Sequence, residues 1–206
     1  MGLDWKALEN AMRVSVLRHA REVIEDHPEH TFYAMALHGV PTEPADTIEM
    51  PVLAMNSEEA YGRDHREEEA IAAFEDPKID DLDTEIEDNG GYYSDRWDCS
   101  QWHWCAMELT GEEAAAIWQR GLSEMIKKDG WEATIRTYYA VMVSVIKDVV
   151  PELATGRNEH LIGFVADDDH AETLLRRCLS DEQLERHFPE LVSGTAEAAA
   201  SSSKGT

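Results

Sequence analysis

The chain has 206 residues, with 43 acidic residues against 18 Lys and Arg, and its formal net charge of −25 disfavours nucleic acid and anionic membranes as partners. Hydrophobic residues make up 43% of the chain, which supplies apolar area for a packed core and argues against a wholly disordered protein. A chain of this length suits one substantial domain. The acidic bias favours a basic partner, and it is equally typical of a protein whose charge serves only solubility.

The three cysteines, Cys99, Cys105 and Cys178, form an odd set without a C-x-x-C pair, which favours a reducing compartment over a disulfide framework. The start of the chain lacks the basic residues and apolar run of a secretory signal. No stretch approaches the roughly 18 apolar residues of a membrane span. These features together predict a cytoplasmic protein.

Apolar residues recur at spacings of three and four from Trp5 onward, which predicts an amphipathic helix with Asp4 as its N-cap. The helix should end at His27, because the proline that follows disfavours helical geometry before it. Residues 31–38 are uncharged and nearly all apolar without helical spacing. They therefore predict a central strand that is buried on both faces.

Residues 50–55 predict a second strand, with a proline near its start where a missing amide donor is tolerated. Asn56 or Ser57 should then cap a helix. Glu58 and Glu59 are favourably placed in the first turn of that helix, because carboxylates near a helix N-terminus interact well with its dipole.

An acidic stretch follows, with fourteen Asp or Glu against three Lys or Arg between residues 57 and 88. Residues 76–91 indicate an exposed loop that repels itself. Next comes an aromatic-rich stretch over residues 92–107, where Asp98 or Ser100 can cap a short helical turn. We interpret this second stretch as a structural hub. It holds three of the six tryptophans, Trp97, Trp102 and Trp104.

The second half of the chain predicts mainly helices. Residues Thr110 to Glu113 have the form of a capping box and open one helix, whose basic end suits a helix C-terminus. Residues 131–150 are apolar nearly all round and predict a long, largely buried helix that Pro151 ends.

Residues 161–165 predict a third short strand. A second capping-box pattern, Asp169 to Glu172, opens a helix directly after it, and a third pattern, Ser180 with Gln183, opens another. All the elements together predict a single α+β domain over residues 1–192, with a small central sheet of short strands packed against several amphipathic helices. Residues 193–206 are small and polar, which predicts a disordered tail.

Two clusters are candidates for chemistry. Cys99, His103 and Cys105 form a C-x3-H-x-C array, which on a helix would place Cys99 and His103 on one face as metal ligands. The same residues could supply a thiol nucleophile and its base, or the cysteines could pack as small hydrophobes. Residues Asp167–Asp169 follow a predicted strand and could hold magnesium, although a helix cap explains Asp169 more simply. The sequence carries no common nucleotide-binding or hydrolase motif, and we expect no cofactor.

Several segments form an ordered set: the opening helix, Phe32–Leu37, Asn56–Glu59, Arg96-Trp97 with Gln101-Trp102, and Ile162–Val165 ending at Asp167–Asp169. Over most of residues 4–191 this set resembles a family of uncharacterised, mainly bacterial proteins, domain of unknown function 4303. The acidic insertion before Tyr92 and the cysteines around His103 depart from the family pattern. The resemblance implies no activity, but small acidic α+β proteins of this kind look like immunity proteins that neutralise toxins by binding.

Our leading hypothesis is therefore a non-enzymatic protein that binds a basic partner, with charge steering the encounter and an aromatic anchor supplying affinity. The alternative is a metal-dependent or thiol enzyme that uses the Cys99, His103 and Cys105 set or Asp167–Asp169. The candidate partner-binding residues are Glu58, Glu59, Glu67, Asp80, Asp81, Asp83, Trp97 and Trp102.

Overall fold

The computed structural model describes residues 2–41, 43–72, 94, 96–167 and 169–192, with side chains left out for residues 67–72, and it shows a single α+β domain. In this described part the strands are β1 (Phe32–His38), β2 (Val52–Ser57), β3 (Trp104–Glu108) and β4 (Ile162–Val165). The helices are α1 (Trp5–Asp26), α2 (Glu58–Ala72), α3 (Glu112–Asp129), α4 (Trp131–Leu153), α5 (Ala171–Cys178) and α6 (Asp181–His187), with 3-10 turns η2 (Cys99–Gln101) and η3 (Gly156–Asn158).

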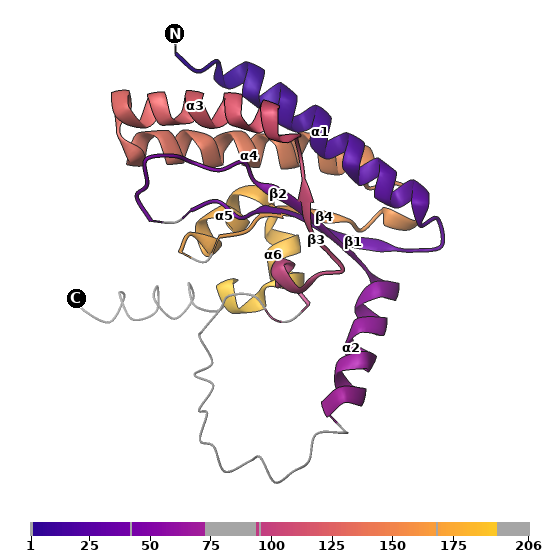
Figure 1. Ribbon diagram of the computed structural model, residues 1–206. Coiled ribbons are helices and arrows are strands. Elements are labelled where there is room, and N and C mark those ends of the chain that lie inside the picture. The colour runs from indigo at the N-terminus through magenta and orange to yellow at the C-terminus, as the bar shows by residue number, and fades with distance from the viewer. Residues whose placement is uncertain (1, 42, 73–93, 95, 168, 193–206) are drawn as a thin grey trace, which may run out of the picture.

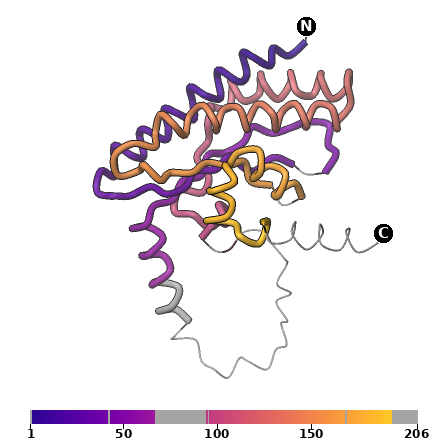
Figure 2. The backbone as a smooth tube through the Cα atoms, turned by 180° about the vertical axis from the view of Figure 1, so that it is seen from behind, coloured from indigo at the N-terminus to yellow at the C-terminus, as the bar shows by residue number. Residues whose placement is uncertain are grey.

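The strands form one mixed sheet in the order β3-β2-β1-β4. β1 pairs antiparallel with β2 and parallel with β4, and β2 pairs antiparallel with β3. Helices α1, α3 and α4 cover one face of the sheet, and α5 and α6 lie on the other (Figure 1). Figure 2 shows the same layers from behind, with α2 extending away from the sheet beyond the end of β2.

Alternation along the strands creates two cores. On β1, Met35 and Leu37 face the larger core under α1 and α4, whereas Ala34 and Ala36 face the smaller core that contains α5 and α6. A register irregularity at the start of β1 returns Phe32 to the larger core, because a bulge interrupts the two-residue period. The central strand β1 is therefore buried on both faces, as its apolar run predicted.

Several local predictions are confirmed. The carboxylate of Asp4 accepts hydrogen bonds from the backbone N–H groups of Lys6 and Ala7, each at 3.0 Å, and α1 ends at its C-cap His27. The hydroxyl of Ser57 accepts from the N–H of Ala60 at 3.0 Å at the start of α2. Ser180 and Gln183 form the predicted capping box of α6.

Other local predictions were wrong. Neither of the remaining capping boxes forms: α3 begins after Gly111 and α5 after His170, and neither cap makes a side-chain hydrogen bond. Pro151 does not end α4, which continues to Leu153, because a proline in the last turn removes only one backbone hydrogen bond there. The strand β3 was not predicted at all, since its half-exposed edge position hides the buried pattern of a central strand.

None of the described helices combines the length and apolar character that crossing a bilayer requires. The predicted acidic loop over residues 76–91 and the predicted tail over residues 193–206 lie outside the described residues. The bounds of the domain therefore stay a prediction.

Candidate functional site

Two tryptophans of the aromatic-rich stretch, Trp97 and Trp102, lie in the smaller core, and Trp104 packs against the larger one. Trp97 is 6% exposed and Trp102 is 2% exposed. The indole N–H of Trp102 and the hydroxyl of Tyr33 both donate to the backbone carbonyl of Arg96, each at 3.0 Å. Both tryptophans are therefore buried and tied to the fold, and neither presents an exposed ring. Their part in partner binding stays a prediction.

The first acidic residues of the predicted partner-binding set also have structural roles. Glu58 forms an ion pair with Arg96, whose guanidinium lies 3.9 Å from the centre of the Tyr33 ring. Burial acts to lower the pKa of Arg96, but the hydrogen bond and charge of Glu58 outweigh it and raise that pKa. Glu59 accepts the backbone N–H of Thr31 at 2.7 Å and so joins α2 to the start of β1.

The remaining acidic candidates cannot be placed in the same way. Glu67 lies in α2 at a position whose side chain is not described, and Asp80, Asp81 and Asp83 lie outside the described residues. Their part in partner binding stays a prediction.

The predicted cysteine and histidine metal site does not form. Cys99 lies in η2 and Cys105 in β3, so Cys99 and His103 are not on one helix. His103 instead contacts Arg63 and Asp64 on α2. Among the described residues, the potential ligand atoms of Cys99, His103 and Cys105 do not all lie within 4.8 Å of one another.

The described geometry gives no support to a thiol nucleophile. The Nε2 atom of His38 lies 2.6 Å from the backbone carbonyl oxygen of Cys105, so this nitrogen bonds to the main chain and not to a thiol. Burial raises the pKa of Cys178 to about 11, so its thiolate is scarce at neutral pH. Cys99 is buried beside the tryptophans in the smaller core.

Asp167, at the carboxyl end of β4, is a buried acceptor shared by three donors. The backbone N–H of His170 donates to its carboxylate at 2.8 Å and the His170 Nδ1 atom lies 3.0 Å from the same oxygen. The hydroxyl of Tyr139 donates to the other oxygen, and burial, followed by the contact with Asp167, raises the pKa of Tyr139. Asp167 therefore orients His170. Asp169 is exposed, and Asp168 lies outside the described residues, so the magnesium site over Asp167–Asp169 stays a prediction.

His170 stands at the edge of a cavity of about 260 Å³ between α4 and α5. Its side chain is 50% exposed, and because Nδ1 faces Asp167, Nε2 is the nitrogen left for a ligand. Arg136 and Arg177 also line this cavity, and neither guanidinium has an ion pair within the described part of the chain. Glu132 lines the cavity as well, so two guanidinium groups and one carboxylate surround the space beside the oriented imidazole.

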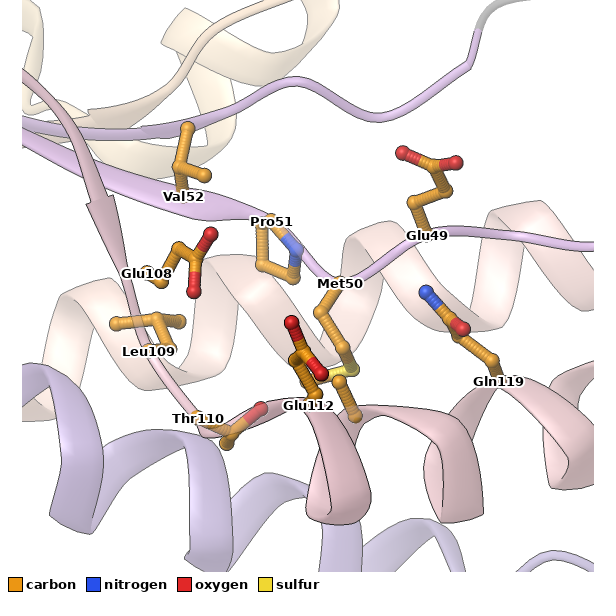
Figure 3. Close-up of a pocket in the computed structure, with 10 residues that line it drawn as sticks. Glu49, Met50, Pro51, Val52, Glu108, Leu109, Thr110, Glu112 and Gln119 are labelled. Carbon is orange, nitrogen blue, oxygen red and sulfur yellow. The ribbon is translucent and has the colours of Figure 1, made fainter.

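A second cavity, of about 320 Å³, has the opposite charge (Figure 3). We call it the acidic pocket; it lies where the start of β2, the end of β3 and the first turns of α3 meet. The carboxylates of Glu108 and Glu112 and the amide of Gln119 point toward its hollow, and Glu49 stands at its rim. All three carboxylates belong to exposed residues, and none forms an ion pair among the described residues.

Thr110 lines the acidic pocket, but its hydroxyl oxygen is shielded from solvent. Its Oγ1 atom is buried and has no hydrogen-bond partner in the described part of the structure. The hydroxyl was predicted to cap α3, but Gly111 takes the cap position and leaves the hydroxyl unused. A buried polar group without a partner costs stability, and because this oxygen is shielded from solvent, a ligand in the pocket does not reach it.

The sequence could not have shown the acidic pocket, because its carboxylates come from three separate segments. The antiparallel register that sets Val52 opposite Glu108 brings two of these segments together. Packing of α3 beside them adds Glu112. In the sequence, Glu112 was assigned only to a capping box, and neither Glu49 nor Glu108 lies in a motif.

Comparison with models of protein families, with curated proteins and with solved structures found no match to this chain. The resemblance described above therefore stays a prediction from the sequence segments that carry it.

Proposed function

We propose that the protein is a non-enzymatic binding protein for a basic partner, and that the acidic pocket receives an arginine side chain of that partner. The observation that supports this proposal is the set of three unpaired carboxylates around one hollow, Glu49, Glu108 and Glu112. A guanidinium presents five N–H donors in a planar fork, which suits carboxylates arranged on several sides.

The size and polarity of the pocket fit this ligand class. Its volume of about 320 Å³ is at the lower end of the roughly 300–1,000 Å³ typical of ligand sites. Met50 and Pro51 give it an apolar wall for the methylene stem, while Gln119 offers an amide oxygen to the head group. The net charge of −25 would steer a basic protein toward the surface before the pocket is reached.

Neutralisation of a basic toxin, as immunity proteins do, is the role that we propose within this class. It requires only tight association and no catalytic group. It is compatible with Trp97 and Trp102 being buried, because the anchor then comes from the partner and the receiving pocket from this chain.

The first test is an NMR titration of the full chain with acetyl-Gly-Arg-Gly-amide and with the citrulline analogue, which keeps the shape and lacks the charge. We expect arginine-dependent shifts at residues 49–52 and 108–112. Replacing Glu49, Glu108 and Glu112 with glutamine should raise the dissociation constant about tenfold. Each exposed ion pair is worth roughly 0.2–1 kcal/mol, and a loss of about 1.4 kcal/mol from the three together corresponds to a tenfold change.

The matched control replaces Glu25, Glu185 and Glu190 with glutamine, since these exposed residues lie outside the acidic pocket and their loss changes net charge equally. This control should bind arginine as the wild type does. If both triple variants weaken binding alike, or if shifts spread evenly over the surface, the pocket is not the site and only general charge attraction is left.

A second candidate function is acid–base catalysis on an anionic substrate, and the oriented His170 beside Arg136 and Arg177 favours it. Asp167 can hold His170 as a base whose Nε2 atom faces solvent, and the two guanidinium groups can hold a phosphate. This candidate replaces the magnesium and thiol versions of the enzyme hypothesis.

Hydrolysis of p-nitrophenyl phosphate tests this candidate directly. If it is right, His170→Gln should reduce turnover at least 100-fold, the lower limit of a typical general-base contribution. His160→Gln is the control, because His160 is exposed and outside this cavity. Equal turnover in wild type and His170→Gln, or no turnover above buffer, would reject catalysis of this ester.

A further inference from the structure

The turn between α1 and β1 brings three potential metal ligands together. The backbone N–H of His30 donates to the carbonyl of His27 at 3.0 Å, which closes a turn with Pro28 at its second position, where the fixed φ of proline is favourable. One ligand atom each from His27, Glu29 and His30 lies within 4.8 Å of the others, and no second such set occurs in the described part of the chain.

The His30 ring is held in an orientation that suits metal binding. Its Nδ1 atom lies 2.8 Å from the hydroxyl of Ser57, and its Nε2 atom lies 3.5 Å from a carboxylate oxygen of Glu29. If Nδ1 carries the proton and donates to Ser57, Nε2 keeps its lone pair for an ion on the side of Glu29. Histidine ligands of metals commonly donate their second ring N–H in this way.

The surrounding contacts fix the rest of the turn. The ring of His27 packs 5.0 Å from that of Trp104 on β3, and the ring of His30 lies 5.8 Å from the same indole. Arg157 donates to the backbone carbonyl of Glu29 at 2.7 Å, which ties the main chain of the turn to η3. The Glu29 side chain itself is 66% exposed and can move toward an ion without disturbing the core.

We propose that His27, Glu29 and His30 bind a divalent metal ion of the zinc class, with a fourth position open to solvent. Two imidazoles and one carboxylate are the donors that zinc, copper and nickel accept, and three protein ligands are typical of zinc sites that keep an open position. Bonds of 2.0–2.2 Å in a tetrahedron separate ligand atoms by roughly 3.3 Å. The 3.5 Å between His30 and Glu29 already matches this, so a rotation of exposed or half-buried side chains completes the site.

The test is calorimetric titration of the metal-stripped full chain with zinc chloride. We expect one equivalent to bind, with Glu29→Gln lowering the affinity at least tenfold and His27→Ala more strongly. Glu29→Gln is the decisive variant because the exposed side chain contributes little to folding. His160→Ala, at an exposed histidine outside the set, should bind as the wild type does.

Copper(II) provides an independent readout, because it quenches nearby indoles. It should quench part of the tryptophan fluorescence in the wild type, and Trp104→Phe should lose that part, since Trp104 contacts both histidines. Three results would overturn the proposal. The wild type could fail to bind one equivalent of zinc, Glu29→Gln and His27→Ala could bind zinc as tightly as the wild type, or Cys99→Ser could lose the zinc affinity instead.

Discussion

Replacing Trp102 with alanine is expected to lower the free energy of unfolding by about 3–5 kcal/mol, the range typical of buried tryptophans. The side chain is 2% exposed and packs edge-on against Tyr33 and Phe164, with ring centres 6.3 and 5.8 Å away. Alanine would leave a cavity between η2 and the sheet, and the Arg96 carbonyl would lose one of its donors. Urea denaturation followed by circular dichroism measures the loss.

Trp102→Phe should lose less, because phenylalanine keeps most of the apolar contact and loses mainly the indole N–H. Ile117→Ala is the surface control: Ile117 is 54% exposed on α3, and its removal should change stability by no more than about 0.5 kcal/mol. A loss below about 1 kcal/mol in Trp102→Ala would contradict the structural hub and return Trp102 to the candidates for partner contact.

Replacing Gly163 with valine should destabilise the protein strongly, and Gly163→Ala by about 1–3 kcal/mol, as overpacking does in a well-packed core. A Cβ atom at this position of β4 would overlap Cγ2 of Val150 and lie 3.1 Å from Cγ2 of Ile146, both on α4. Both neighbours are β-branched and cannot easily rotate away. The helix would have to move off the sheet, and the midpoint of thermal unfolding reports this.

Gly62→Ala is the matched control, because Gly62 lies in α2 and the nearest atom to an added Cβ is the flexible end of Arg66 at 3.6 Å. Alanine should be neutral there or stabilise the helix by up to about 1 kcal/mol. If Gly163→Ala unfolds at the wild-type temperature, then α4 and β4 are not packed as closely as this contact requires.

Local signals predicted much of the secondary structure. The cap of Asp4, the end of α1 at His27 and the capping box at Ser180 depend on backbone within a few residues, so short patterns suffice. The buried strand β1 was recognisable because a strand covered on both faces is apolar throughout. The capping boxes at Thr110 and Asp169 did not form, since α3 begins after Gly111 and α5 after His170.

The metal-binding turn is local in sequence, yet its chemistry was not recognised there. His27, Glu29 and His30 match no familiar ligand spacing, and only the fold brings Ser57 and Trp104 against the rings. The array at Cys99 had the more suggestive spacing and was wrong, because a strand, rather than a helix, follows η2. Ligand spacing is informative only when the backbone conformation between the ligands is known.

By itself, the sequence determined the acidic character, the α+β class and most helices, because composition, periodicity and caps act over short distances. Only the tertiary structure decided which side chains meet. Strand order and register brought Glu49 and Glu108 to one pocket, and the packing of α4 on β4 joined Tyr139 to Asp167 and His170. Such pairings depend on contacts between segments far apart in the chain, which no local pattern encodes.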